Sequence, residues 1–263
     1  MSAPKPRTDY ERIAPAYDCD RQEYDSFDAT LAALLQAALQ AAQSAGTPRL
    51  LVDVGCGTGT LLARFEGDAG DAFDWQTVGV DTSRKMLSVA RGKVFASALA
   101  AGAAEALPLA SGAAGCVLST FAFHHFSSLG EFLREVRRVL APNGRLVLRN
   151  ILPREGPQPL MYRFFPGARE IDDRRFPLHA EILAELEAAG LQLASEHVDE
   201  RVHRFTAARY LELCKKRTIS QLHLVLDESF RSGMAAIERH QREHPDELLE
   251  ECVPVHTFVA TRP

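Results

Sequence analysis

The residues best suited to chemistry form a glycine-rich loop, Asp53–Gly59, between a short apolar run and a helical pattern. Glycines at 55, 57 and 59 let the backbone turn sharply and approach a ligand closely. The helix that follows offers unpaired N–H groups to a negative or carbonyl-bearing group. The loop therefore indicates a small-molecule site, and the alternative is a tight strand–helix turn without a ligand.

An acidic residue follows at the end of the next apolar run. Asp81 lies 22 residues after Gly59, where a carboxylate can accept both hydroxyls of a ribose. The alternative is a solvated aspartate. The two features together, in a strand–turn–helix context, favour a cofactor that contains a nucleoside.

The position of the glycines and of Asp53 narrows the class of cofactor. The dinucleotide fingerprint G-x-G-x-x-G places its third glycine at position 60, and this chain has Thr60 there. A carboxylate at Asp53 would oppose a pyrophosphate but could act, directly or through water, near an ammonium group. This favours a cofactor that carries an amino acid over one that carries a diphosphate.

Strands and helices alternate around these residues. Predicted strands cover 49–55, 77–81, 98–101, 115–120, 145–150, 191–204 and 253–263, and predicted helices cover 28–43, 60–65, 83–91, 128–140 and 179–190. Such alternation predicts an α/β fold: a Rossmann-like doubly wound sheet, mostly parallel, with an antiparallel last strand. Ligands of such sheets bind beyond the carboxyl ends of the strands.

The chain is predicted to be a single domain over 1–263. Its parts are a helical N-terminal cap (1–46), a cofactor-binding core (47–152), helical lid segments over the acceptor site (153–177 and 206–250), and a closing helix and strands (178–205 and 251–263). The acidic run 241–251 is predicted to be a solvated helix.

Composition excludes several classes of protein. The 263 residues are 46% hydrophobic and 25% charged, which is ordinary for a soluble globular protein. A net charge of −5 argues against a nucleic-acid partner. Five scattered cysteines without a C-x-x-C pair predict reduced thiols and no metal site. Without a visible secretory signal or an apolar run long enough for a bilayer, a cytoplasmic protein without membrane association is expected.

Five segments resemble the class I S-adenosylmethionine-dependent methyltransferases. VDVGCGTGT (52–60) and VGVDTSRKMLSVAR (78–91) look like their first two motifs. GAAEALPLASGAAGCVLSTFAFHHF (102–126) and EVRRVLAPNGRLVLRN (135–150) resemble the adenine loop and the elements that follow it in the branch that includes the ubiquinone and menaquinone methyltransferases. YERIAPAYD (10–18) is similar to the N-terminal segment that folds over the cofactor there.

The resemblance implies S-adenosylmethionine as the cofactor and assigns its contacts. Asp53 would lie near the amino group and Asp81 would hold the ribose hydroxyls. Tyr17 would cap the methyl end, and Glu105 would stand in for the Asp or Asn that relatives carry at the position of Ala103. The remaining cofactor residues that the resemblance implies are Gly55, Cys56, Gly57, Gly59, Thr82, Met86, Ala104, Thr120 and Phe121.

His124 and His125 follow the fourth strand, where the methyl group is expected. One hypothesis is that one of them is a general base or orients the acceptor. The alternative is a structural role, with one histidine packing under the cofactor and one bonding to a loop.

Aromatic and arginine residues are mixed in the first lid segment and recur later in the chain. Arginine binds carboxylates bidentately, so one hypothesis is a grip on an anionic acceptor by Tyr162, Arg163, Arg169 and Arg204. The alternative is a solvated helix face on which the arginines pair with neighbouring acidic residues.

These observations predict methyl transfer to a small-molecule acceptor at an oxygen, nitrogen or carbon atom. The transfer is an in-line displacement in which the protein acts mainly by positioning. A nicotinamide-dependent oxidoreductase, a protein or nucleic-acid methyltransferase and a non-catalytic binding module are the alternatives. The loop 120–123 reads Thr-Phe-Ala-Phe, which speaks against base methylation.

Overall fold

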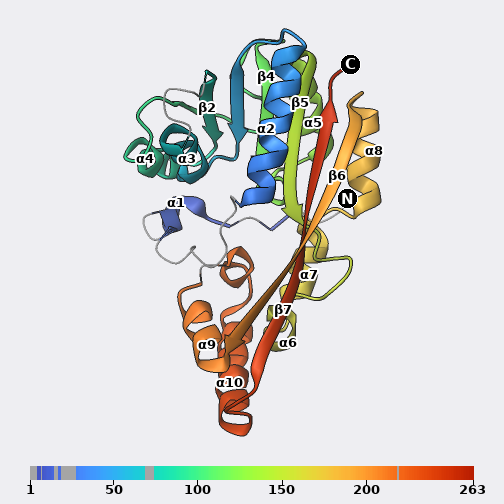
Figure 1. Ribbon diagram of the computed structural model, residues 1–263. Coiled ribbons are helices and arrows are strands. Elements are labelled where there is room, and N and C mark those ends of the chain that lie inside the picture. The colour runs from blue at the N-terminus through green and yellow to red at the C-terminus, as the bar shows by residue number, and fades with distance from the viewer. Residues whose placement is uncertain (1–4, 7, 15–16, 19–27, 69–73, 218) are drawn as a thin grey trace. The chain divides into compact units, whose positions relative to one another are not determined.

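The computed structural model describes residues 5–6, 8–14, 17–18, 28–68, 74–217 and 219–263 (Figure 1). The contacts within the chain define two compact units. The larger unit comprises Asp9–Asn150, Ala180–His197 and His256–Pro263, and the smaller unit comprises Met1–Thr8, Ile151–His179 and Val198–Val255. The single-domain division expected from the sequence stays a prediction.

A seven-stranded sheet has the strand order β3-β2-β1-β4-β5-β7-β6. The strands are β1 (Leu50–Val54), β2 (Gln76–Asp81), β3 (Ala98–Ala101), β4 (Ala114–Thr120), β5 (Leu140–Ile151), β6 (Gln192–Thr206) and β7 (Leu248–Thr261). Strands β1 to β5 pair in parallel, and β5, β7 and β6 are antiparallel. The predicted Rossmann-like sheet with an antiparallel last strand is confirmed.

The register of the parallel strands brings the predicted site residues to one edge of the sheet. Asp53 of β1 lies opposite Gly79 of β2 and Leu118 of β4. All three strands therefore end at the same edge. The glycine loop after β1 therefore lies at this edge, together with Asp81 at the end of β2 and Thr120 at the end of β4.

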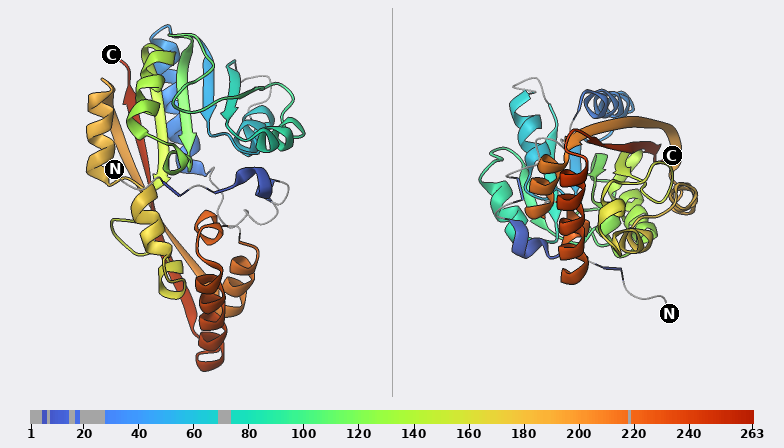
Figure 2. Two further views of the ribbon diagram at one scale, coloured as in Figure 1. Left: turned by 180° about the vertical axis from the view of Figure 1, so that it is seen from behind. Right: turned by 90° about the horizontal axis from the view of Figure 1, so that it is seen from below.

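Helices of the larger unit cover both faces of this sheet, with α2 on one face and α5 on the other (Figures 1 and 2). The helices are α1 (Tyr10–Ile13), α2 (Ala29–Ser44), α3 (Thr60–Asp68), α4 (Arg84–Arg91), the 3-10 turn η4 (Phe123–His125), α5 (Leu129–Val139) and α8 (His179–Ala188). The Ser128 hydroxyl accepts the Glu131 N–H at 3.2 Å, which confirms the predicted start of α5. Leu31 and Leu35 of α2 pack in a buried cluster with Leu51 and Leu118 of the sheet.

The smaller unit is helical in both segments that were predicted to be helical. It contains α6 (Met161–Phe164), α7 (Ala168–Arg175), α9 (Ala207–Lys215), the 3-10 turn η5 (Ser220–His223) and α10 (Asp227–Glu243). The role of these helices as a lid stays a prediction. In the part of the chain that the structure describes, no helix is both long and apolar enough to cross a membrane.

The prediction of one solvated helix over 241–251 is wrong. Helix α10 ends at Glu243, and β7 begins at Leu248. Pro245 lies between them, and its ring disfavours helical backbone at the residue before it. The chain therefore reverses into a strand, and Leu249 and Glu251 of that strand are buried.

Candidate functional site

The glycine loop has the left-handed backbone that its sequence predicts. Gly55, Gly57 and Gly59 have φ values of +78°, +54° and +71°. A Cβ atom on Gly55 would come within 2.5 Å of the Ala122 Cβ atom, whereas one on Gly57 would meet nothing within 4 Å. Gly55 is thus required by packing inside the protein, and Gly57 faces open space in which a ligand could lie.

Asp81 is fixed next to this loop by two backbone donors. The N–H of Gly57 donates to Oδ2 at 2.9 Å and the N–H of Ser83 donates to Oδ1 at 2.8 Å. Burial raises the pKa of the Asp81 carboxyl, although these two hydrogen bonds oppose the shift. Each carboxylate oxygen retains a lone pair for a further donor, so the group is oriented to accept hydroxyls.

Asp53 is a buried carboxyl beneath the loop. Its residue is 2% exposed, and burial, with a smaller contribution from the charge of Asp81, raises the pKa of Asp53 to about 7. A nearby cation would favour the ionised form. A buried carboxyl of this kind fits the ammonium group of an amino-acid cofactor, as the sequence predicts, and does not fit a pyrophosphate.

Cys56 lies within the loop, where its surroundings disfavour the thiolate form. The side chain is buried, and burial raises the pKa of the thiol far above its usual range, with the charges of Asp53 and Asp81 acting in the same direction. The reactive form of cysteine is the thiolate. Cys56 packs in a buried cluster with Leu62 and Leu87, and its contact with a cofactor through the backbone stays a prediction.

The segment 10–18 is bound to the glycine loop through Asp18. Its carboxylate accepts the Thr58 hydroxyl at 2.7 Å and the Lys93 ammonium at 2.6 Å. At the other end of the segment, Glu11 accepts a hydrogen bond from the Ser83 hydroxyl, which lowers the pKa of Glu11. Sequence reasoning assigned a role only to Tyr17, although Asp18 ends the same quoted motif.

The two histidines after β4 make different contacts. Nε2 of His125 lies 2.6 Å from the Tyr10 hydroxyl, and Nδ1 of His124 lies 3.0 Å from the Asn150 amide nitrogen. His124 is buried and His125 is half-buried, with 3.9 Å between their ring centroids. The geometry suits His124 to a structural role and leaves His125 as the better candidate for contact with an acceptor.

Phe121 is a strained position that sequence reasoning did not identify as strained. Its φ of +50° is rare for a bulky residue, and its N–H donates to the Arg149 carbonyl at 2.8 Å. Strained backbone of this kind concentrates at ligand sites. The backbone role that the resemblance assigns to Thr120 and Phe121 is compatible with this geometry.

The residues predicted to lie near the adenine follow β2 and β3 or belong to α4. Met86 is 1% exposed and Ala104 is 5% exposed, whereas Thr82 is exposed. Oε1 of Glu105 accepts the N–H groups of Ser127 and Ser128. Glu105 thus holds the loop after β4, and its expected bond to an adenine stays a prediction.

The predicted acceptor residues belong to the smaller unit and have protein partners there. The Tyr162 hydroxyl donates to Asp172 at 2.8 Å. Burial raises the pKa of Tyr162, and the Asp172 carboxylate acts in the same direction. Arg169 lies 3.9 Å from Asp173, and Arg204 lies 3.0 Å from Glu250, both as exposed pairs.

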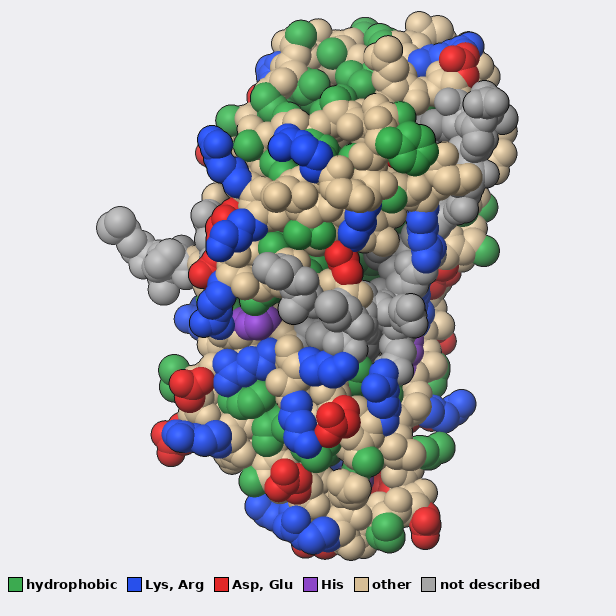
Figure 3. All heavy atoms as spheres, turned by 90° about the vertical axis from the view of Figure 1, so that its left-hand side faces the viewer, with side chains coloured by type: hydrophobic (Ala, Val, Ile, Leu, Met, Phe, Trp, Pro, Cys, Tyr) green, Lys and Arg blue, Asp and Glu red, His purple; other side chains and the backbone are tan. Residues whose placement is uncertain are grey.

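Arg163 NH2 lies 3.5 Å from Nδ1 of His240. The Arg169–Asp173 and Arg204–Glu250 pairs are of the kind that the alternative predicted, whereas Arg163 contacts a histidine. On the face drawn in Figure 3, basic side chains lie among acidic ones. Acceptor binding by these four residues stays a prediction.

Comparison with known proteins places this geometry in a family. The family model described as "Methyltransferase domain" matches residues 52–148, which run from Val52 of β1 to Leu148 of β5 and include the glycine loop and Asp81. The chain is 35% identical over 161 residues to the demethylmenaquinone methyltransferase of Thermus thermophilus, covering 59% of this chain and 70% of that protein.

Two solved structures show the same fold. A candidate methyltransferase of an antibiotic biosynthesis pathway from Anabaena variabilis has 20% identity and a TM-score of 0.65, over 88% of this chain and 98% of that one. The [4+2]-cyclase SpnF has 18% identity and a TM-score of 0.58, and the match covers 100% of this chain and 99% of that one. Identities this low establish the fold alone.

The strand order, the glycine loop with its following aspartate and the sequence relationship to the Thermus enzyme agree with one another. The chain belongs to the class I S-adenosylmethionine-dependent methyltransferases, in the branch similar to the ubiquinone and menaquinone methyltransferases.

Proposed function

We propose that the larger unit binds S-adenosylmethionine at the carboxyl ends of β1, β2 and β4 and transfers its methyl group to a small molecule. The observation that carries the proposal is the pairing of Gly57 with Asp81. Open space adjoins the missing side chain of Gly57, and the Gly57 N–H orients the Asp81 carboxylate beside it. A ribose could approach the backbone there and donate both hydroxyls.

Three further groups fit the rest of the cofactor. The buried Asp53 carboxyl would pair with the ammonium of the methionine portion, which compensates its desolvation. Met86 would pack near the adenine. Tyr17 would close the methyl end, held there through its neighbour Asp18 and the contacts of Asp18 to Thr58 and Lys93.

The chemistry asks little of the protein besides alignment. The bound cofactor supplies a methyl group on a positively charged sulfur, which is already a good leaving group. The residues of the chain hold the acceptor in line with that group and exclude water. His125, oriented by the Tyr10 hydroxyl at 2.6 Å, would accept a proton from an acceptor whose reacting atom becomes nucleophilic only on deprotonation.

The acceptor class follows from the relatives and not from contacts. The Thermus relative is named for demethylmenaquinone, which supports a small quinone-type or phenolic acceptor. Methylation of carbon or oxygen in such a molecule requires loss of an acidic proton, and this is the proton that His125 would accept. Binding of an anionic acceptor by Tyr162, Arg163, Arg169 and Arg204 stays a prediction from the sequence.

Calorimetric titration with S-adenosylhomocysteine tests the cofactor assignment, with NADH as the competing ligand. The wild type should bind S-adenosylhomocysteine at one site and should not bind NADH. Asp81→Ala should weaken binding at least tenfold, about 1.4 kcal/mol. Asp74→Ala, which removes a carboxylate with 78% side-chain exposure, is the matched control. Binding of NADH in place of S-adenosylhomocysteine would refute the proposal.

Methyl transfer itself is tested with cofactor labelled in the methyl group and a panel of hydroquinones, phenols and aromatic acids. Label should pass to at least one hydroquinone or phenol. Transfer only to amines, or cofactor binding without any transfer, would contradict the proposed acceptor class while leaving the cofactor site intact.

A further inference from the structure

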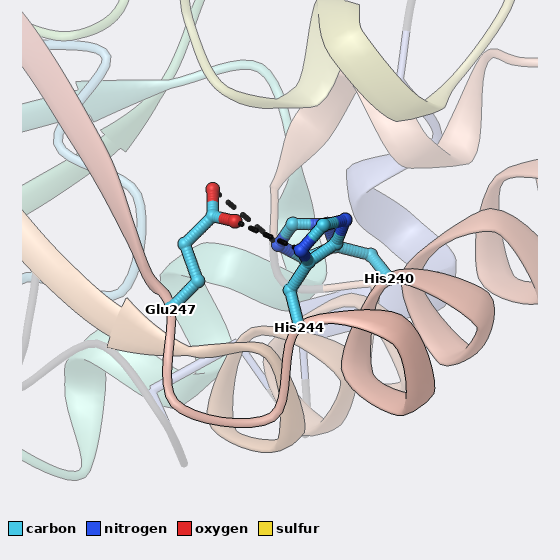
Figure 4. A group of neighbouring side chains, drawn as sticks. All are labelled: His240, His244 and Glu247. Carbon is cyan, nitrogen blue, oxygen red and sulfur yellow. Dashed lines mark ion pairs between the residues drawn. The ribbon is translucent and has the colours of Figure 1, made fainter.

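Three potential metal ligands meet where α10 ends in the smaller unit. They are His240 and His244, one helical turn apart, and Glu247 in the connection to β7. One ligand atom from each lies within 4.8 Å of the others. Figure 4 shows both imidazole rings and the carboxylate turned toward one another. No predicted function of the chain uses these residues.

The local backbone creates this arrangement. The His244 N–H donates to the His240 carbonyl at 2.8 Å, and the Glu247 N–H donates to the His244 carbonyl at 3.2 Å. Pro245 between them ends the helix. The chain thus folds back over its last turn, which brings the Glu247 carboxylate 3.8 Å from Nε2 of His240 and 3.6 Å from Nδ1 of His244.

The burial of His240 is an independent indication that a ligand belongs here. The residue is 7% exposed, and its buried Nε2 atom has no hydrogen-bond partner among the described residues. An unsatisfied buried polar atom costs free energy and is rare in folded proteins. This atom faces the other two ligands, so a metal ion placed among them would satisfy it.

The donor set specifies the class of ion. Two imidazole nitrogens and one carboxylate oxygen form a zinc ligand set that leaves the fourth tetrahedral position to water. With metal–ligand distances of about 2.0–2.1 Å, neighbouring ligand atoms lie roughly 3.3 Å apart. The two Glu247 oxygens lie 3.8 Å and 3.6 Å from the ring nitrogens of His240 and His244, and the three ligand atoms lie within 4.8 Å of one another, so the side chains must draw together to bind the ion. We propose that His240, His244 and Glu247 bind one Zn²⁺ ion.

The backbone and two acidic residues near the cluster favour a cation, whereas Arg163 and Arg242 oppose it. The carbonyl ends of α10 carry the negative end of the helix dipole. The acidic residues Glu243 and Asp246 flank His244 and Pro245 in the sequence. The bound ion would link the last turn of α10 to the start of β7 and so hold the corner between them, independently of methyl transfer.

The Arg163 side chain competes with a metal ion for His240. Its NH2 group lies 3.5 Å from Nδ1 of His240, and a donor there favours a ring whose proton is on Nε2. Metal binding at Nε2 needs the proton on Nδ1, so Arg163 must turn away. Its exposed side chain has room to do so. Removal of this arginine should therefore strengthen zinc binding.

The test uses the full chain without an affinity tag, freed of metal with a chelator. Calorimetry should show one Zn²⁺ per chain, and Co²⁺ should give the visible absorption of a four-coordinate ion. His244→Ala and Glu247→Gln alter half-exposed side chains and should fold. Each should weaken Zn²⁺ binding at least tenfold. Arg163→Ala should strengthen it.

Two matched controls separate this cluster from other ligands. His256→Ala removes a histidine that contacts a carboxylate, Glu196, at 3.1 Å, outside the cluster. Cys252→Ser removes a half-buried thiol on β7. Both should bind Zn²⁺ as the wild type does. A second readout is hydrogen exchange, in which Zn²⁺ should slow exchange of the backbone amides of 244 and 246–248 in the wild type and not in His244→Ala.

Two results would overturn the proposal. One is the absence of stoichiometric Zn²⁺ or Co²⁺ binding to the wild type. The other is binding that survives in His244→Ala and Glu247→Gln, because the ion would then lie elsewhere.

Discussion

The Tyr10 hydroxyl lies 2.6 Å from Nε2 of His125, and the two rings meet edge-on with 4.9 Å between their centroids. The first residue comes from α1 and the second from the turn after β4, 115 positions later in the chain. The Tyr17 ring lies 5.7 Å from that of Tyr10. The rings of Tyr10, Tyr17 and His125 thus form an aromatic cluster beyond the end of β4, where the methyl group is expected.

Tyr10→Phe removes this hydroxyl and keeps the ring contact. Because His125 would lose the group that orients it, we expect kcat to fall about tenfold, which corresponds to about 1.4 kcal/mol, with little change in the KM for the cofactor. His125→Ala should cost at least as much, and the double variant should cost less than the sum of the two. Steady-state kinetics of the three variants measure this. Wild-type kcat in His125→Ala would exclude the histidine from the mechanism.

Asp53→Asn tests the role of the buried carboxyl through pH. With a pKa of about 7, only about one tenth of the carboxyl is ionised at pH 6 and about three quarters at pH 7.5. An ammonium ligand prefers the ionised form, so the wild type should bind S-adenosylhomocysteine several-fold more tightly at pH 7.5. Calorimetry at both pH values should show this dependence in the wild type and not in Asp53→Asn.

The stability of the ligand-free protein should fall as the pH rises, whereas its affinity for the cofactor rises. A pKa raised above the unfolded value of about 3.9 means that the folded state holds the proton more tightly. The contribution of this group to stability is complete below about pH 4 and is lost as the pH rises through about 7. Asp53→Asn should therefore be more stable than the wild type at pH 8, by roughly 1–3 kcal/mol, and close to it at pH 4. Denaturant unfolding at both pH values measures this difference. An Asp53→Asn variant less stable than the wild type at pH 8 would contradict the expectation.

Alanine at Gly57 should separate ligand binding from folding. The new Cβ atom would meet nothing in the protein, so stability should fall by only about 1 kcal/mol for the positive φ, while the affinity for S-adenosylhomocysteine should fall at least tenfold. Gly46→Ala is the control, because Gly46 also has a positive φ and open space. It should lose similar stability and no affinity.

Gly55→Ala should instead damage the fold. Its Cβ atom would come within 2.5 Å of the Ala122 Cβ atom, and we expect a loss of roughly 2–4 kcal/mol from overpacking and backbone strain together. Thermal and denaturant unfolding measure the difference. Equal stability of the Gly55→Ala and Gly57→Ala variants would contradict the geometry of the loop.

Arg149 on β5 should be a strong determinant of stability. Its side chain is fully buried and donates to Asp28 at 2.7 Å and to the Thr257 hydroxyl at 2.8 Å. Arg149→Ala would leave Asp28 without this partner, and we expect a loss of about 3–5 kcal/mol. Arg145→Ala, on the same strand and with an exposed hydrogen bond, should cost less than 1 kcal/mol. Urea unfolding of the two variants tests the contrast.

Local signals in the sequence were sufficient for the elements of the sheet. The strand at 98–101, predicted from a weak alanine-rich pattern, is β3 with those bounds. The helix predicted over 241–251 is wrong because acidic composition alone does not determine a helix, whereas Pro245 disfavours helical backbone there. The motif YERIAPAYD indicated that 10–18 belongs near the cofactor, but composition could not show that Asp18 pairs with Lys93 at 2.6 Å.

The sequence by itself determined the alternation of strands and helices, the glycine loop and the aspartate that follows it, because each depends on short-range backbone preferences and on hydrophobic periodicity. Only the tertiary structure decided which distant side chains meet. The Tyr10–His125 and Asp28–Arg149 contacts join residues more than a hundred positions apart, and the raised pKa of Asp53 depends on burial by other elements. The spacing of His240, His244 and Glu247 can be read in the chain, but the burial that leaves Nε2 of His240 without a partner arises only when α10 packs in the folded protein.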